Sequence, residues 1–144
     1  MQQIDFHYNV KNRSNYACRL LKKITTLGRT ACVWSRDSVL LNRVYTELWT
    51  FEDEGFYPHA WAGTPYASEA GIVFGGDIEA LGSGDVLVLL DEDVPPDWQS
   101  VFARFDRVVD IVSTDPEELV RSRARYRAYK SAGVPLKVFD RRGN

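Results

Sequence analysis

The segment Asp85-Val-Leu-Val-Leu-Leu90 constrains the fold more than any other part of the chain. A short, continuous apolar run of this kind is typical of a strand at the centre of a sheet that is covered on both faces. Elsewhere, short apolar or β-branched runs alternate with segments whose apolar residues recur at helical spacing. We therefore expect an α/β fold, a single three-layer domain with a largely parallel central sheet.

The expected elements follow from these patterns and from turn and cap residues. Strands are expected over residues 4–10, 30–34, 72–74, 85–90, 106–112 and 134–139, the last at an edge of the sheet. Helices are expected over 15–27, from a cap at Ser35 or Asp37 to Trp49, shortly after Pro95, and over 115–133. Ser14 is the expected cap of the first helix, and residues 51–65 are expected to form a loop. No internal repeat or linker is visible, so residues 1–144 are expected to form one domain.

Composition narrows the class of protein. The chain is 44% hydrophobic and 26% charged, which is typical of a soluble globular protein. No long apolar run and no leader-like N-terminus are present, so we expect a cytoplasmic protein that does not enter a membrane. Cys18 and Cys32 match no metal-binding spacing and are expected to be free thiols.

Nucleotide binding is the first function that an α/β fold suggests, because phosphates often bind at a glycine-rich turn between a strand and a helix. The expected junctions at 9–14 and 35–38 contain no glycine, and no phosphate-loop or dinucleotide motif occurs. Gly75-Gly76 and Gly82-Ser-Gly84 are expected to lead into strands instead. A nucleotide-dependent enzyme with a degenerate phosphate site is thus the alternative hypothesis.

Catalytic and metal-binding constellations are also poorly supported. His7 is expected in a strand and His59 in a loop, and neither has a catalytic neighbour in the sequence. Asp91-Glu-Asp93 follows the central strand, where Mg²⁺ could bind, but a solvated acidic turn is the simpler interpretation. We expect no catalytic residues, no cofactor and no metal.

Basic residues are concentrated at the carboxyl end. Residues 121–144 contain eight Lys or Arg and one acid, whereas the whole chain has a net charge of −2. Asp115 and Glu118 form a capping-box pattern at the start of the expected helix, and Gly133 marks its end. Such a basic helix on an acidic body indicates a surface that meets a negatively charged partner.

Helical phasing divides this basic helix into faces. A stripe of small residues is expected to pack on the sheet: Val120, Ala124, Ala128 and Ser131. Arg123, Tyr126, Arg127 and Lys130 fall together on another face. Cations around an aromatic ring suit an acidic peptide that ends in a carboxylate, since arginine offers a planar fork to carboxylates. Direct binding of single-stranded DNA, or a merely solvated face, are the alternatives.

A second candidate surface lies in the segment 48–59, which combines the end of a helix with an aromatic loop. Trp49, Phe51 and Phe56 are its large aromatic residues. Aromatic side chains flanked by polar residues often mark protein interfaces, although they can also plug the edge of a sheet.

Taken in order, several segments resemble the chi subunit of bacterial DNA polymerase III holoenzyme over nearly the whole chain. The segments that carry this resemblance are Asp5-Phe-His-Tyr8, Leu48-Trp49, Phe56-Tyr-Pro-His59, residues 85–90, residues 105–112 and residues 123–133. The resemblance implies a fold like the nucleotide-binding domain of a helicase without its phosphate loop. It also implies a non-catalytic accessory protein of the clamp loader that contacts DNA only indirectly.

The resemblance further implies two partners. One is the acidic, Phe-terminated C-terminal tail of single-stranded DNA-binding protein, held by Val112, Arg123, Tyr126, Arg127 and Leu136. The other is a psi-type subunit of the clamp loader, held by Trp49, Phe51 and Phe56. Val112 and Leu136 rest on the resemblance alone, and the final segment Asp140-Arg-Arg-Gly-Asn144 matches nothing in the family pattern.

Overall fold

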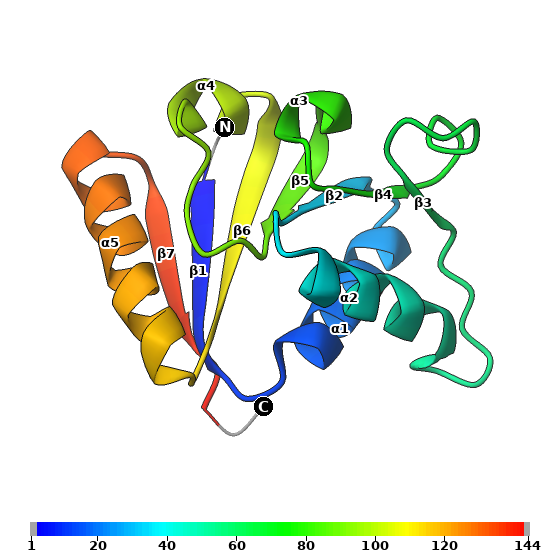
Figure 1. The fold of residues 1–144 in the computed structure, drawn as a ribbon, viewed down its shortest axis with the longest axis horizontal. Helices are drawn as coiled ribbons and strands as arrows, with labels where there is room; N and C mark the ends of the chain where they lie inside the picture. The colour runs from blue at the N-terminus through cyan, green and yellow to red at the C-terminus, as the bar shows by residue number, and fades with distance from the viewer. Residues whose placement is uncertain (1–2, 143–144) are drawn as a thin grey trace.

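One parallel sheet organises the protein, for which a computed structural model describes residues 3–142 (Figure 1). The sheet order is β3-β4-β2-β5-β6-β1-β7, and every adjacent pair is parallel. The strands are β1 (Gln3–Val10), β2 (Ala31–Trp34), β3 (His59–Trp61), β4 (Ile72–Gly75), β5 (Gly84–Leu89), β6 (Phe105–Ser113) and β7 (Leu136–Asp140). The largely parallel sheet expected from the sequence is confirmed.

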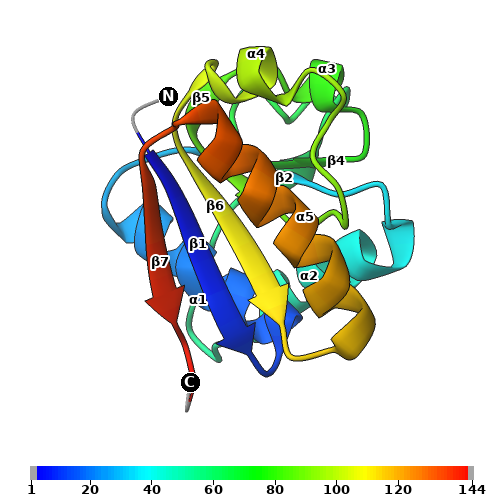
Figure 2. The same ribbon diagram turned by 90° about the vertical axis from the view of Figure 1, so that its left-hand side faces the viewer.

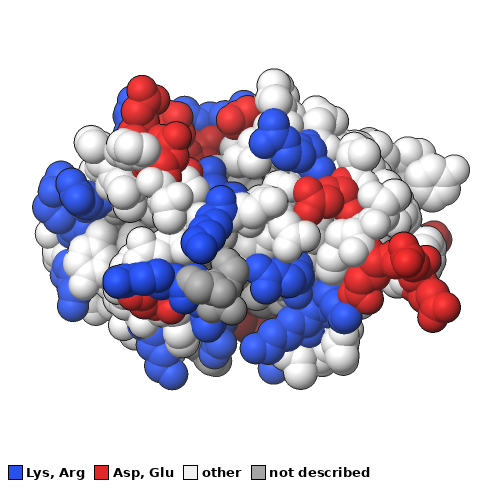
Figure 3. Space-filling model, turned by 90° about the horizontal axis from the view of Figure 1, so that it is seen from below, with Lys and Arg blue, Asp and Glu red and all other residues white. Residues whose placement is uncertain are grey.

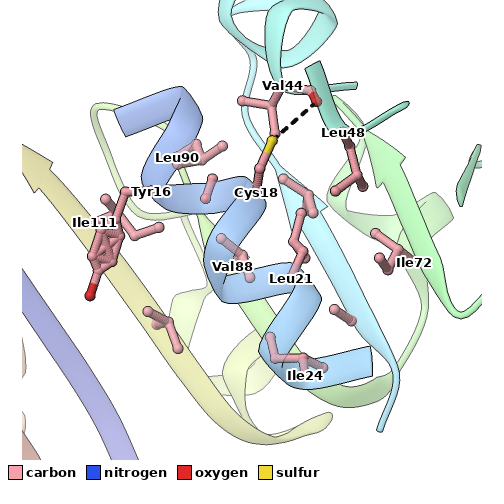
Figure 4. Close-up of a cluster of buried hydrophobic side chains, with 14 of the residues drawn as sticks. Tyr16, Cys18, Leu21, Ile24, Val44, Leu48, Ile72, Val88, Leu90 and Ile111 are labelled. Carbon is pink, nitrogen blue, oxygen red and sulfur yellow. Dashed lines mark hydrogen bonds between the residues drawn. The ribbon is translucent and has the colours of Figure 1, made fainter. Parts of the chain in front are cut away.

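Helices cover both faces of this sheet and complete a three-layer α/β domain. They are α1 (Arg13–Thr26), α2 (Ser38–Thr50), α3 (Ile78–Leu81), α4 (Trp98–Phe102) and α5 (Pro116–Ala132). Successive residues of β5 face opposite layers. Val88 packs in the cluster of α1 and α2 (Figure 4), whereas Leu87 and Leu89 pack with α3, α4 and α5. Burial of β5 on both faces explains its continuous apolar sequence.

Two short elements depart from the expected pattern. β3 lies within the segment expected to be a loop and forms an edge of the sheet beside β4. Gly75 and Gly76 do not lead into a strand, because Gly75 ends β4 and Gly76 lies between β4 and α3. A Cβ atom at Gly75 would lie 3.2 Å from Leu81 and 3.3 Å from Ala62, so close packing favours glycine there. Since α3 has a single turn capped by Asp77, this junction does not form a phosphate loop.

The start of α1 also differs from the expectation. Asn12 is the cap, accepting a hydrogen bond from the backbone N–H of Asn15 at 3.1 Å. Ser14 is the second residue of α1, is buried, and donates its hydroxyl proton to Glu47 of α2. At the start of α2, Asp37 rather than Ser35 caps the helix.

No helix in residues 3–142 has the length and apolar character needed to cross a lipid bilayer.

Candidate protein-binding surfaces

α5 begins and ends where the sequence predicts. The carboxylate of Asp115 accepts hydrogen bonds from the backbone N–H groups of Glu117 and Glu118, and Gly133 closes the helix with φ of 70°. Glu118 does not complete a capping box, because its carboxylate instead accepts from the backbone N–H and hydroxyl of Ser113. These two bonds tie the first turn of α5 to the end of β6.

The face of α5 that packs on the sheet is not the small-residue stripe. Val120 is 64% exposed, and Ala124 and Ser131 are exposed as well. The buried residues are Ser122, Arg125 and Tyr129. The prediction of a small-residue contact was therefore wrong, and a charged residue takes the place of an apolar stripe.

A buried carboxylate in β6 explains this choice. Asp110 is fully buried and accepts two hydrogen bonds from Arg125, at 2.9 Å from Nε and 3.0 Å from Nη2. The hydroxyl of Tyr129 donates to the same carboxylate at 2.7 Å, and Arg125 Nη1 donates to the carbonyl of Glu92. Burial lowers the pKa of Arg125, but the Asp110 carboxylate outweighs this effect and raises it overall. Burial and the same carboxylate raise the pKa of Tyr129.

The aromatic ring predicted for the tail site lies at the edge of the covered sheet face. Tyr126 is half-buried, its ring centroid 5.5 Å from that of Phe6 in β1. Arg123 and Arg127 are exposed, and Lys130 Nζ lies 5.8 Å from the Tyr126 centroid. Within residues 3–142, Arg123, Arg127 and Lys130 form no ion pair with an acid. Their charges therefore face solvent instead of the protein's own acids.

The two sheet residues of the predicted site differ in exposure. Leu136 is half-buried on the edge strand β7 and pairs with Ile4, whose side chain packs in the α5 layer. Parallel partners point to the same side of a sheet, so Leu136 and the 46%-exposed Val138 face α5 too. Val112 faces the same side as Asp110 but is fully buried. It therefore supports the predicted tail-binding surface from beneath and has no exposed area with which to contact a peptide. In Figure 2, α5 runs alongside β6, and β1 and then β7 follow on the other side of β6.

The aromatic segment after α2 splits into an exposed and an inner part. Trp49 is 42% and Phe56 72% exposed, with ring centroids 6.0 Å apart. Phe51 is half-buried and packs against Tyr57 and the α1–α2 cluster. Trp49 and Phe56 thus form an exposed aromatic pair, whereas Phe51 supports the loop from beneath.

The carboxyl edge of the sheet, where α/β proteins usually bind nucleotides, has a hollow of about 960 Å³. Figure 3 views this end, where basic side chains are spread out and acidic ones gather in separate patches. The amino ends of α1, α2 and α5 meet the hollow, but Asn12, Asp37 and Asp115 already accept from their first N–H groups. Phosphate oxygens would have to displace these side chains.

In the acidic turn after β5, residues 91–93, the carboxylate of Asp91 forms an ion pair with Arg36. Arg36 Nη2 donates to Asp91 at 2.8 Å, and the backbone N–H of Arg36 donates to the same carboxylate. Burial raises the pKa of Asp91, but these hydrogen bonds lower it below its ordinary value. In the part of the chain that the structure describes, no three His, Cys, Asp or Glu converge as metal ligands.

Comparison with known proteins decides the family. The family model described as "DNA polymerase III chi subunit, HolC" matches residues 1–137. The chain belongs to the DNA polymerase III chi subunit family. It is 26% identical over 140 residues to the DNA polymerase III subunit chi of Pseudomonas aeruginosa, covering 94% of each chain. The resemblance noted in the sequence is thereby confirmed, and this chi-family chain is an accessory subunit in DNA replication.

Proposed function

We propose that this chi-family protein is a non-catalytic link between the clamp loader and single-stranded DNA-binding protein. The surface of α5 and β7 would hold the acidic C-terminal tail of the latter, and the Trp49–Phe56 pair would hold a psi-type subunit. The observation that carries the proposal is the half-buried Tyr126 ring, which packs on Phe6 of β1, the strand paired with β7, while Arg123 and Arg127 on the same helix are exposed.

The chemistry of this surface supports the choice of an acidic tail with a terminal aromatic residue. Arg123 and Arg127 have no acid of the protein as partner within residues 3–142, so both can bind carboxylates. Tyr126, Leu136 and Val138 supply apolar area for a ring. Val112 supports this area from below. The predicted affinity is modest and falls with salt, because exposed charge pairs are screened.

Titration of a labelled acidic peptide ending in Pro-Phe tests this surface. Arg123→Ala should weaken binding by about 1–3 kcal/mol if the arginine makes charge-assisted hydrogen bonds to the tail. Tyr126→Ala and removal of the peptide's terminal Phe should each weaken it as well. Arg121→Ala is the matched control, since Arg121 is exposed on the same helix near Asp93. Unchanged titrations of Arg123→Ala and Tyr126→Ala would refute the placement.

The second partner surface is tested separately. Trp49→Ala and Phe56→Ala should each reduce co-purification of a psi-type subunit, because exposed aromatics of this kind act as interface anchors. Phe56 is 72% exposed, so the thermal stability of the free Phe56→Ala protein should change little, whereas Trp49 is 42% exposed and packs on His59, so its variant should lose some stability. Val39→Ala, which removes another exposed apolar side chain on α2, serves as the control. Full retention of the psi-type subunit by both variants would contradict the assignment.

A further inference from the structure

A hollow of about 590 Å³ lies on the face of the sheet opposite α5. It lies between one flank of α1 and the strands β1, β6 and β7. Its walls include Leu20 and Leu27 of the α1 region, Val109 of β6 and Phe139 of β7. A second hollow of about 220 Å³ adjoins it, sharing His7 and Arg141 and adding Arg19.

Strand register explains why this hollow exists. His7 pairs with Phe139, and Asp5 pairs with Lys137; these residues alternate with the side chains that face α5. They therefore point to the side of α1. That helix packs over the central strands through Leu21 and its neighbours, and in Figure 4 β6 lies between this helix and β1. The outer part of this sheet face is left without a covering helix among the described residues.

The hollow has more cations than its own acids neutralise. Within residues 3–142, Arg19, Lys23, Arg29 and Arg141 form no ion pair. The other cation, Arg107, is 3.4 Å from the carboxylate of Asp5.

Of the other titratable groups of the hollow, His7 is neutral near neutral pH, whereas Asp85 and Asp106 keep their negative charges. The carboxylate of Asp85 accepts from the backbone N–H of Thr30 at 2.8 Å. His7 adds no cation near neutral pH, because burial and Arg141 lower its pKa to about 4. Asp106 is the exposed acid of this hollow. The four cations that form no ion pair within the described residues outnumber these two acids, so the rim keeps a net positive charge that is available to an acidic partner.

Apolar surface lies among these cations. Leu27 is 65% exposed at the end of α1, although helical spacing predicted it as part of the apolar stripe. Leu20 and Phe139 are half-buried, and the guanidinium of Arg141 lies 5.1 Å from the Phe139 centroid. Exposed apolar surface rimmed by charge is typical of sites that bind another protein.

We propose that this hollow binds an acidic peptide segment of a partner protein, with a large apolar residue on Leu20, Leu27 and Phe139. Lys23, Arg29 and Arg141 would pair with its carboxylates. A nucleic acid fits less well, because Asp5, Asp85 and Asp106 lie among the cations and would repel closely spaced phosphates. The site does not rest on the tail-binding surface, since the sheet separates the two.

A labelled synthetic peptide of alternating Asp and Leu, amidated at its carboxyl end, is the probe. Amidation removes the terminal carboxylate that the α5 surface is proposed to bind. The peptide should bind the full chain and shift the methyl resonances of Leu20 and Leu27. The double variant Lys23→Gln/Arg29→Gln should weaken binding by about threefold to thirtyfold, since each exposed charge pair contributes modestly. Arg43→Gln/Arg121→Gln makes the same charge change elsewhere and should bind like the parent protein.

The outcomes separate this proposal from the tail-binding one. Tyr126→Ala should leave binding of the Asp-Leu peptide unchanged while it weakens binding of the Pro-Phe peptide. Absence of peptide binding, or methyl shifts confined to α5 and β7, would overturn the proposal. So would an oligothymidylate that displaces the peptide and binds the hollow more tightly, because the site would then serve nucleic acid.

Discussion

Replacing Arg125 by methionine should lower the free energy of unfolding by about 3–5 kcal/mol, because the carboxylate of Asp110 would remain buried without a counter-charge. Arg125 is 2% exposed and Asp110 is fully buried, so solvent cannot replace the lost guanidinium. Methionine has a similar length and no charge, so the substitution removes the ion pair while keeping much of the packing volume.

The magnitude follows from the hydrogen bonds that are lost. Arg125 makes two bonds to Asp110, at 2.9 and 3.0 Å, and a third to the carbonyl of Glu92. Hydrogen bonds to charged groups contribute about 1.5–3 kcal/mol each, but the remaining bond from Tyr129 at 2.7 Å still stabilises the carboxylate in part. Tyr129→Phe, which removes that bond alone, should cost about 1.5–3 kcal/mol.

Urea denaturation followed by circular dichroism measures the effect as a shift in midpoint at constant slope. The double variant Arg125→Met/Asp110→Leu is the informative control. It removes both charges, so it should be more stable than Arg125→Met alone. A loss below about 1 kcal/mol for Arg125→Met, or a double variant no more stable than the single one, would refute the argument that an unpaired buried charge sets the cost.

Three other outcomes are expected. The free energy of unfolding should fall as pH decreases from about 6.5 to about 4, because His7 binds a proton near pH 6.5 in the unfolded chain and only near pH 4 in the folded protein. Urea titrations across this range should show a smaller fall for His7→Gln than for the parent protein. Arg13→Ala should cost about 2–4 kcal/mol in the same assay, since Arg13 donates to the carbonyls of Leu90 and Ile111 and lies 3.1 Å from Glu118. Mg-ATP should not raise the melting temperature, and a concentration-dependent rise would revive the nucleotide-enzyme hypothesis.

The central strands of the sheet could be predicted because a strand buried on both faces has a run of apolar residues that is easily recognised in the sequence. Residues 86–90 are continuously apolar and residues 108–112 are apolar except for Asp110, and these runs mark the central strands β5 and β6. β3 could not be recognised in this way, because it has only three residues between Gly- and Pro-containing loops and so shows no apolar run or alternation. It is a strand because β4 offers it a hydrogen-bonding edge, which is a property of the assembled sheet.

The contact face of α5 could not be read from helical spacing, because its sequence is polar on every side. Arg125 is buried only because β6 places Asp110 beneath it. The sequence contains one signal that bears on this contact, an aspartate in the middle of Val-Val-Asp-Ile-Val. A carboxylate in a buried strand requires a cation, and searching the helices for that cation would have pointed to the basic helix.

The positions of the proposed surfaces suit a linking role. The Trp49 ring lies 3.9 Å from that of His59, which belongs to the edge strand β3, whereas Leu136 and Val138 lie on the opposite edge strand β7. Six strand spacings separate the two edges, which at about 4.8 Å each amounts to roughly 29 Å. Sites so far apart with no shared residues usually act independently. A psi-type subunit and an acidic tail could therefore be held at once, each by its own edge of one rigid sheet.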